Sequence, residues 1–176
     1  MKYSMFFLLI CFNLISDELD WKKQDAYIQL SSVEIQTPVP GKGSLIRFDP
    51  ADPDLRKNFE TTPKRDGIVC RIPGKYLVFS AIQPATFCRG LSGYIDCWFE
   101  INGAALPGSN ARQYVDEISY VAELTLITLI ELKENDILSC AFSASGPNIG
   151  TIFIQSSLSS EPSVTSFALS AYKICE

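Results

Sequence analysis

Apolar and polar residues alternate with a period of two over much of this chain, and short breaks rich in glycine, proline or charge separate the alternating runs. The clearest run is Tyr94–Ile101, in which Ile95, Cys97, Phe99 and Ile101 fall on one side and the polar and aromatic residues on the other. Such alternation is typical of a β-strand with one face in the core. The dipeptide Asn102–Gly103 follows directly and predicts a hairpin turn.

The other alternating runs predict a chain made of strands and turns. The sequence indicates eight to ten strands and no helix, because the longest run is rich in β-branched residues. The remaining predicted strands are Ser32–Gln36, Ser44–Phe48, Gly67–Ile72, Lys75–Gln83, Ser119–Leu132, Ile137–Ala144, Thr151–Gln155 and Thr165–Ile174. Polar loops are expected over 49–66, 84–93, 104–118 and 156–164. The fold class that follows is all-β, an antiparallel β-sandwich or jelly roll.

One run, Lys75–Gln83, is apolar on both of its faces. Tyr76, Val78 and Ile82 share one side, and Leu77, Phe79 and Ala81 share the other. Strands of this kind are usually covered on both faces. We therefore expect this strand to lie centrally between packed layers and to pair with Gly67–Ile72 through the turn at Pro73–Gly74.

Composition and charge narrow the functions that the chain can have. The 176 residues are 47% hydrophobic, enough for one domain with a sizeable core. The formal net charge is −5 and no basic cluster occurs, which disfavours nucleic acid or an anionic membrane as the main partner. The absence of histidine excludes serine or cysteine triads with a histidine base, and zinc sites that contain histidine.

The N-terminus resembles a short secretory signal. Lys2 precedes an apolar run of about 11 residues, too short for a bilayer span. We assign residues 1–16 to a signal peptide, with a first buried strand or a lipoprotein signal at Cys11 as alternatives. Residues 17–43 form an N-terminal segment with a possible first strand, and residues 44–176 form the globular domain. The signal peptide predicts a secreted or cell-surface protein without an integral membrane span.

Six cysteines are present, and five remain after removal of the signal. Cys88 and Cys97 flank a short loop and are the candidate disulfide. Cys70 and Cys140 lie in mid-strand and are expected to be buried thiols. Cys175 could form a disulfide either within the chain or between subunits. No C-x-x-C pair occurs, which disfavours a structural zinc site or a thioredoxin-type site.

Two groups of carboxylates carry possible chemistry. Asp49, Asp52 and Asp54 share one loop, which is either a solvated loop or a calcium site. Asp96 and Glu100 share the polar face of one strand, either as an ordinary wet face or as the carboxylate pair of a glycosidase. The solvated alternatives are preferred, so no metal, cofactor or catalytic residue is predicted.

Five motifs, taken in their order along the chain, are similar to a known family. They are Leu45–Asp49, Gly67–Phe79 with its Pro-Gly-Lys-Tyr turn, Phe99–Ala104 with its Asn-Gly hairpin, Leu129–Leu138, and Phe167–Tyr172. This order resembles the globular head domain of complement C1q, within the C1q/tumour-necrosis-factor-like superfamily. The chain departs from it in having no Gly-X-Y stalk and in carrying Asn135 where glycine is usual.

The resemblance covers about residues 44–174 and implies a ten-stranded jelly roll that forms a homotrimer. Such domains bind proteins or glycans through their loops and are not enzymes. Tyr94 and Trp98, on the outer face of their strand, are the candidate interface, although they could instead pack beneath the long loops. Two alternatives remain: a surface fibre-head or capsid-like jelly roll, and a carbohydrate-active enzyme on a β-sandwich.

Overall fold

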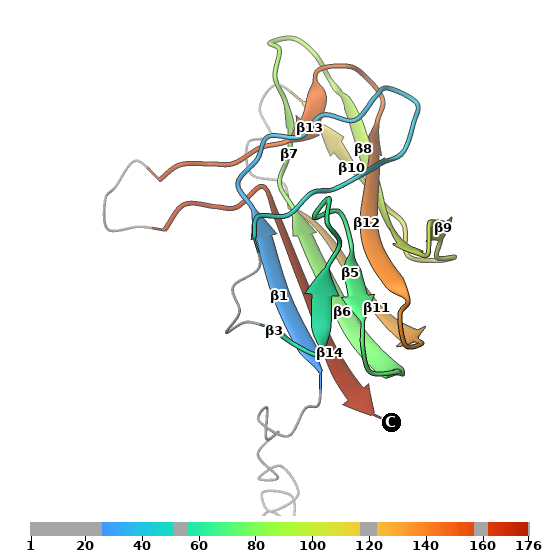
Figure 1. Cartoon of the computed structure of the whole chain (residues 1–176). Helices are drawn as coiled ribbons and strands as arrows, with labels where there is room; N and C mark the ends of the chain where they lie inside the picture. The colour runs from blue at the N-terminus through green and yellow to red at the C-terminus, as the bar shows by residue number, and fades with distance from the viewer. Residues whose placement is uncertain (1–25, 51–55, 117–122, 157–161, 176) are drawn as a thin grey trace, which may run out of the picture.

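The computed structural model describes residues 26–50, 56–116, 123–156 and 162–175, and these residues form a β-sandwich. Two antiparallel sheets face one another across a single core (Figure 1). Strands, turns and loops account for the described chain, with no helix among them. The predicted fold class, an all-β antiparallel sandwich, is confirmed. Within the same ranges no helix is long and apolar enough to cross a membrane.

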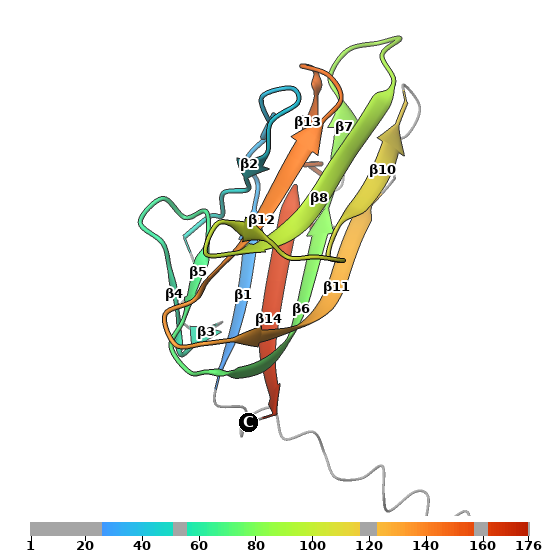
Figure 2. The same cartoon turned by 90° about the vertical axis from the view of Figure 1, so that its right-hand side faces the viewer.

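The first sheet has five strands, in the order β11–β6–β14–β1–β3. Their bounds are β1 (Tyr27–Ser32), β3 (Arg56–Lys57), β6 (Gly74–Ile82), β11 (Leu124–Leu132) and β14 (Phe167–Cys175). The last strand, β14, therefore lies between β1 and β6 in the middle of the sheet. The start of β1 and the end of β14 meet at one end of the sandwich, where Tyr27 is opposite Tyr172 (Figure 2).

The second sheet has seven strands, with the path β10–β8–β12–β5–β4 and two short additions on β12 and β8. Their bounds are β2 (Ser44–Leu45), β4 (Phe59–Thr61), β5 (Ile68–Cys70), β8 (Gly93–Ile101), β9 (Ala104–Ala105), β10 (Ala111–Val115) and β12 (Ile137–Ala144). A two-stranded sheet of β7 (Pro84–Thr86) and β13 (Ile149–Thr151) continues β6 and β12 at the opposite end from the C-terminus.

Alternate residues of both sheets fill the core, as the period of two requires. Its largest fully buried side chains include Tyr76, Phe48, Phe99, Phe142 and Phe167. The buried hydroxyl of Tyr76 donates a hydrogen bond of 2.5 Å to the carbonyl of Ile72, so the ring is buried without leaving its polar atom unpaired. Among the described residues, every buried side-chain nitrogen and oxygen has a partner.

The backbone angles of two turns explain which residues occupy them. Asn102 and Gly103 both have positive φ, 54° and 79°, and join β8 to β9 as an Asn-Gly hairpin should. Asn135, with φ of 67°, stands in the turn between β11 and β12. Asparagine tolerates this left-handed backbone better than most residues, so it suits this position of the turn.

Three expectations about strands were wrong. The first strand is Tyr27–Ser32 and not Ser32–Gln36, because Ile28 and Leu30 reach the core while Ile35 is exposed. It joins the five-stranded sheet, so the folded unit begins well before residue 44. The strands on either side of Pro73–Gly74 do not pair with one another, since β5 and β6 lie in opposite sheets and the turn crosses the sandwich.

Three stretches that were expected to be loops contain short strands. Residues 49–66 contain β3 and β4, residues 84–93 contain β7, and residues 104–118 contain β9 and β10. These strands have two to five residues and lie at or near sheet edges. Short edge strands need few apolar residues, so their sequences alternate weakly.

Candidate functional site

The outer face of the β10–β8 pair carries a compact group of aromatic and charged side chains. We call it the tyrosine patch, and it consists of Tyr94 and Asp96 of β8 and Arg112 and Tyr114 of β10. The register places Tyr94 directly opposite Tyr114 and Asp96 directly opposite Arg112. Residues opposite one another on antiparallel strands share a face, so the four side chains are neighbours outside the sandwich.

The tyrosine patch is held together by three contacts. Nε and Nη2 of Arg112 donate to Oδ1 and Oδ2 of Asp96, at 2.7 and 2.8 Å. The same guanidinium lies 3.8 Å from the centroid of the Tyr94 ring, a cation–π contact. The rings of Tyr94 and Tyr114 meet edge to face with centroids 6.0 Å apart. The hydrogen bonds to Asp96 raise the pKa of Arg112, so the guanidinium stays charged.

Trp98, the other predicted interface residue, lies on the same face of β8 but in a different environment. Its indole Nε1 donates to Glu100 at 2.9 Å, and the ring is half-buried. A Cβ atom on Gly43 would come within 2.8 Å of the ring, so the segment before β2 lies against it. Trp98 thus packs under a loop, the alternative left open by the sequence, whereas Tyr94 joins the tyrosine patch.

A second surface was not singled out from the sequence and lies on the outer side of the five-stranded sheet. We call it the apolar face, and it consists of Leu77 and Phe79 of β6 and Ile127 and Leu129 of β11. Ile127 is opposite Phe79 and Leu129 is opposite Leu77. Ile127 and Leu129 are 62% and 65% exposed. Tyr172 of β14, opposite Leu77, extends this face across the sheet.

The cysteines are not where a loop disulfide would require them. Cys88 and Cys97 are both free, which corrects the candidate pairing. Cys97 points into the core from β8 and is fully buried, whereas Cys88 is exposed in the loop before that strand. Cys70 and Cys140 are buried free thiols, as predicted. Burial raises the pKa of Cys140 to about 12.

The predicted carboxylate groups are occupied by structural contacts where they are described. Asp49 accepts a hydrogen bond of 2.9 Å from the backbone N–H of Val33, and Asp52 and Asp54 lie outside the described residues. Asp96 is engaged by Arg112 and Glu100 by Trp98. In the described ranges no group of three acidic or cysteine side chains is arranged to hold a metal ion.

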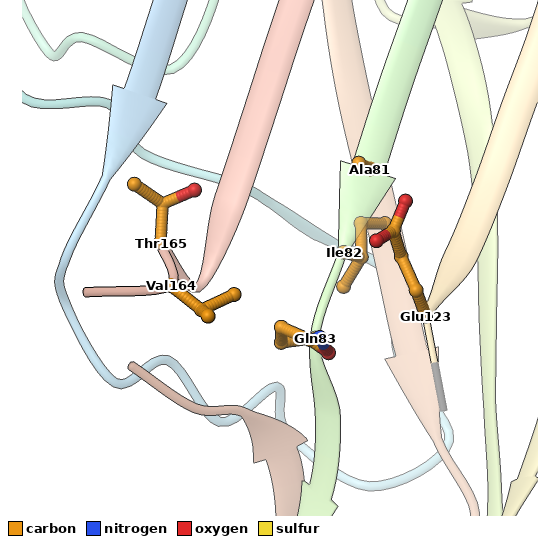
Figure 3. Close-up of a pocket in the computed structure, with 6 residues that line it drawn as sticks. All are labelled: Ala81, Ile82, Gln83, Glu123, Val164 and Thr165. Carbon is orange, nitrogen blue, oxygen red and sulfur yellow. The ribbon is translucent and has the colours of Figure 1, made fainter. Parts of the chain in front are cut away.

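A small hollow lies at the end of β6. It is lined by Ala81, Ile82, Gln83, Glu123, Val164 and Thr165 (Figure 3). Its volume of about 50 Å³ is far below the roughly 300–1,000 Å³ of typical small-molecule pockets. The hollow is therefore too small to enclose a substrate of ordinary size.

No model of a known protein family matches this chain, and no curated protein matches it significantly. The class that the structure defines is an antiparallel β-sandwich with one uncovered apolar face and a tyrosine patch on the opposite sheet.

Proposed function

We propose that this chain is a secreted, non-catalytic binding module that assembles as a homotrimer and recognises a protein or glycan surface. The observation that carries the proposal is the apolar face. Strand β6 is apolar on both sides, yet in a single chain only its inner side is covered by the opposite sheet. Covering the outer side with a second copy would complete the two-layer burial that such a strand needs.

The order of strands supports the resemblance to the C1q/tumour-necrosis-factor-like jelly roll. The chain passes back and forth between the two sheets, and its last strand inserts between β1 and β6. This wrapping is what a jelly roll requires. We assign the subunit contact to the apolar face and not to Tyr94 and Trp98, because Trp98 is already packed under the segment before β2.

The arrangement of carboxylates supports a non-catalytic role. Asp96 and Glu100 are four residues apart on one strand, so their Cα atoms lie about 13 Å apart. The paired carboxyl groups of glycosidases are about 5–9.5 Å apart. Both side chains are also engaged, by Arg112 and Trp98 respectively.

Light scattering on the secreted, mature protein tests the proposal. We expect a particle with three times the mass of the mature chain, and a stable monomer would contradict the trimer. Intact mass measured without reduction also reports whether residues 1–16 have been removed. Turnover of a glycan substrate that Asp96→Asn or Glu100→Gln abolishes would contradict the non-catalytic assignment.

A further inference from the structure

The tyrosine patch lies on the sheet opposite the apolar face, so the proposed self-association leaves it open. Tyr114 is 67% exposed, the largest exposed fraction among the large hydrophobic side chains of the described residues. A tyrosine ring that protrudes from a short edge strand contributes little to the core. A role in recognition explains its position better than a role in stability.

The contacts within the patch hold its rings in a defined orientation. Arg112 is fixed by two hydrogen bonds to Asp96 and lies over the ring of Tyr94. Tyr94 in turn meets Tyr114 edge to face. Two rings inclined at 69° form a corner whose walls are π-faces and whose rim carries phenol hydroxyls. Because these side chains are already held in place, binding a ligand costs little additional side-chain entropy.

The charge of the patch identifies the class of ligand. Arg112 and Asp96 neutralise one another, and Ser143, opposite Asp96 on β12, adds only a hydroxyl. The patch therefore has no net charge to attract an anionic or cationic group. It offers aromatic surface beside hydroxyl and carboxylate groups, which suits a ligand that is neutral, hydroxylated and apolar on one face.

The size of the patch argues against a protein partner. A fully buried tyrosine covers about 150–250 Å², so the two tyrosines offer at most about 500 Å². A stable protein interface needs roughly 800 Å² on each partner. On the same sheet face, Trp98 is already half-buried beneath the segment that contains Gly43, so the exposed aromatic area does not extend in that direction.

We propose that the tyrosine patch binds a neutral carbohydrate, with the C–H face of a pyranose ring stacked on Tyr114. Polarised C–H groups of the sugar meet the electron-rich face of the Tyr114 ring, and sugar hydroxyls bond to Asp96, Ser143 and the hydroxyl of Tyr94. The inference rests on the proposed binding function and specifies its ligand. A shallow surface of this kind gives a dissociation constant of the order of 1 mM per protomer, strengthened by three copies in a trimer.

Saturation-transfer NMR and calorimetry with named probes test this. The probes are cellotetraose, chitotetraose, laminaritetraose and lactose, with 6′-sialyllactose as the anionic comparator. We expect at least one neutral probe to bind with its C–H protons saturated. Tyr114→Ala should weaken that binding at least tenfold, and Tyr114→Phe, which keeps the ring, should change it less than about threefold. Ile127→Ser on the opposite sheet should leave the affinity of each protomer unchanged.

Several results would overturn the inference. They are no neutral probe bound at about 10 mM, equal binding by Tyr114→Ala, binding of the anionic probe alone, or a changed oligomeric mass in Tyr114→Ala. The last result would make the patch a subunit contact. A trimer that binds no probe sugar refutes the carbohydrate inference and leaves the proposed assembly intact. Hydrolysis of a bound probe refutes the non-catalytic function and leaves the binding site intact.

Discussion

Replacing Ile127 and Leu129 together by serine removes the most exposed part of the apolar face. Full burial of such a side chain contributes about 1.5–3 kcal/mol, and roughly two-thirds of each side chain is exposed in the single chain. Covering it in an assembly therefore contributes about 1–2 kcal/mol per residue. A closed trimer contains three copies of each residue. The double variant should weaken assembly by about 6–12 kcal/mol, at least four powers of ten in the association constant.

Sedimentation velocity over about 1–100 µM measures this effect directly. We expect the parent protein to sediment as a trimer and the double variant as a monomer with an unchanged circular dichroism spectrum. The fold should survive because both side chains point away from the core, where substitutions usually change stability by less than about 0.5 kcal/mol. The free energy of unfolding of the monomer is measured in the same buffer.

Ile35→Ser is the matched control, because Ile35 is 61% exposed but lies in the loop after β1. It removes the same side chain from a comparable environment outside the apolar face. A double variant that keeps the mass of the parent protein would refute the assignment of the subunit contact. Equal dissociation by Ile35→Ser would show that general hydrophobicity, and not this face, drives association.

Three further predictions concern stability and are checked by urea unfolding. Gln36→Ala should cost about 2–3 kcal/mol, because its buried amide exchanges two hydrogen bonds of 2.9 Å with the backbone of Arg47; a loss below about 0.5 kcal/mol would contradict this. Asn135→Ala should be about 1 kcal/mol less stable than Asn135→Gly, since φ is positive there; equal stabilities would show no backbone strain. The pKa of Cys140 is raised by burial from 9.0 to about 12. The stability that the buried neutral thiol contributes to the fold is therefore complete below about pH 9 and is lost as the pH rises toward 12. Cys140→Ala should therefore flatten the decline of unfolding free energy between about pH 9 and 11, whereas Cys88→Ala should not; an unchanged slope in Cys140→Ala would refute the link.

The strands that alternate strongly could be predicted from the sequence because one of their faces is buried. Strand β8 has the expected bounds within a residue, with Cys97 and Phe99 facing the core. The hairpin at Asn102–Gly103 was predictable because few residues accept its two positive φ angles. Local chemistry decides both features, so no distant partner had to be known.

The first strand could not be placed in the same way. Residues 27–32 and 32–36 both alternate, and a period of two does not say which of two adjacent runs finds a partner. Pairing with β14 decides it, because Leu30 lies opposite Leu169 and both reach the core. Residues 33–36 instead turn away, and buried Gln36 ties them to β13. These contacts join residues more than 100 positions apart, so local patterns do not contain them.

The tyrosine patch was half predictable. The alternation of β8 identifies Tyr94 as an aromatic residue on an outer face, but the polar character of residues 104–118 predicts a loop and so gives no role to Arg112 and Tyr114. Strand β10 is a short edge strand whose inward positions are Ala111, Gln113 and Val115, of which only Val115 is both strongly apolar and buried. Its alternation of large outward residues was the available clue. Its pairing with β8 is a property of register, which the sequence of β10 does not encode.

Strand β6 shows how a pattern can describe more than the fold of one chain. Its apolar residues on both faces predicted a covering layer on each side. The single chain covers only the inner side, on which Tyr76, Val78 and Ile82 are buried. On the other side, Leu77 and Phe79 are half-buried beside two strongly exposed neighbours of β11. Selection for folding alone favours polar residues at such positions, because exposed apolar faces promote aggregation. The uncovered residues therefore support the proposed assembly, in which a second copy of the chain would supply the missing layer.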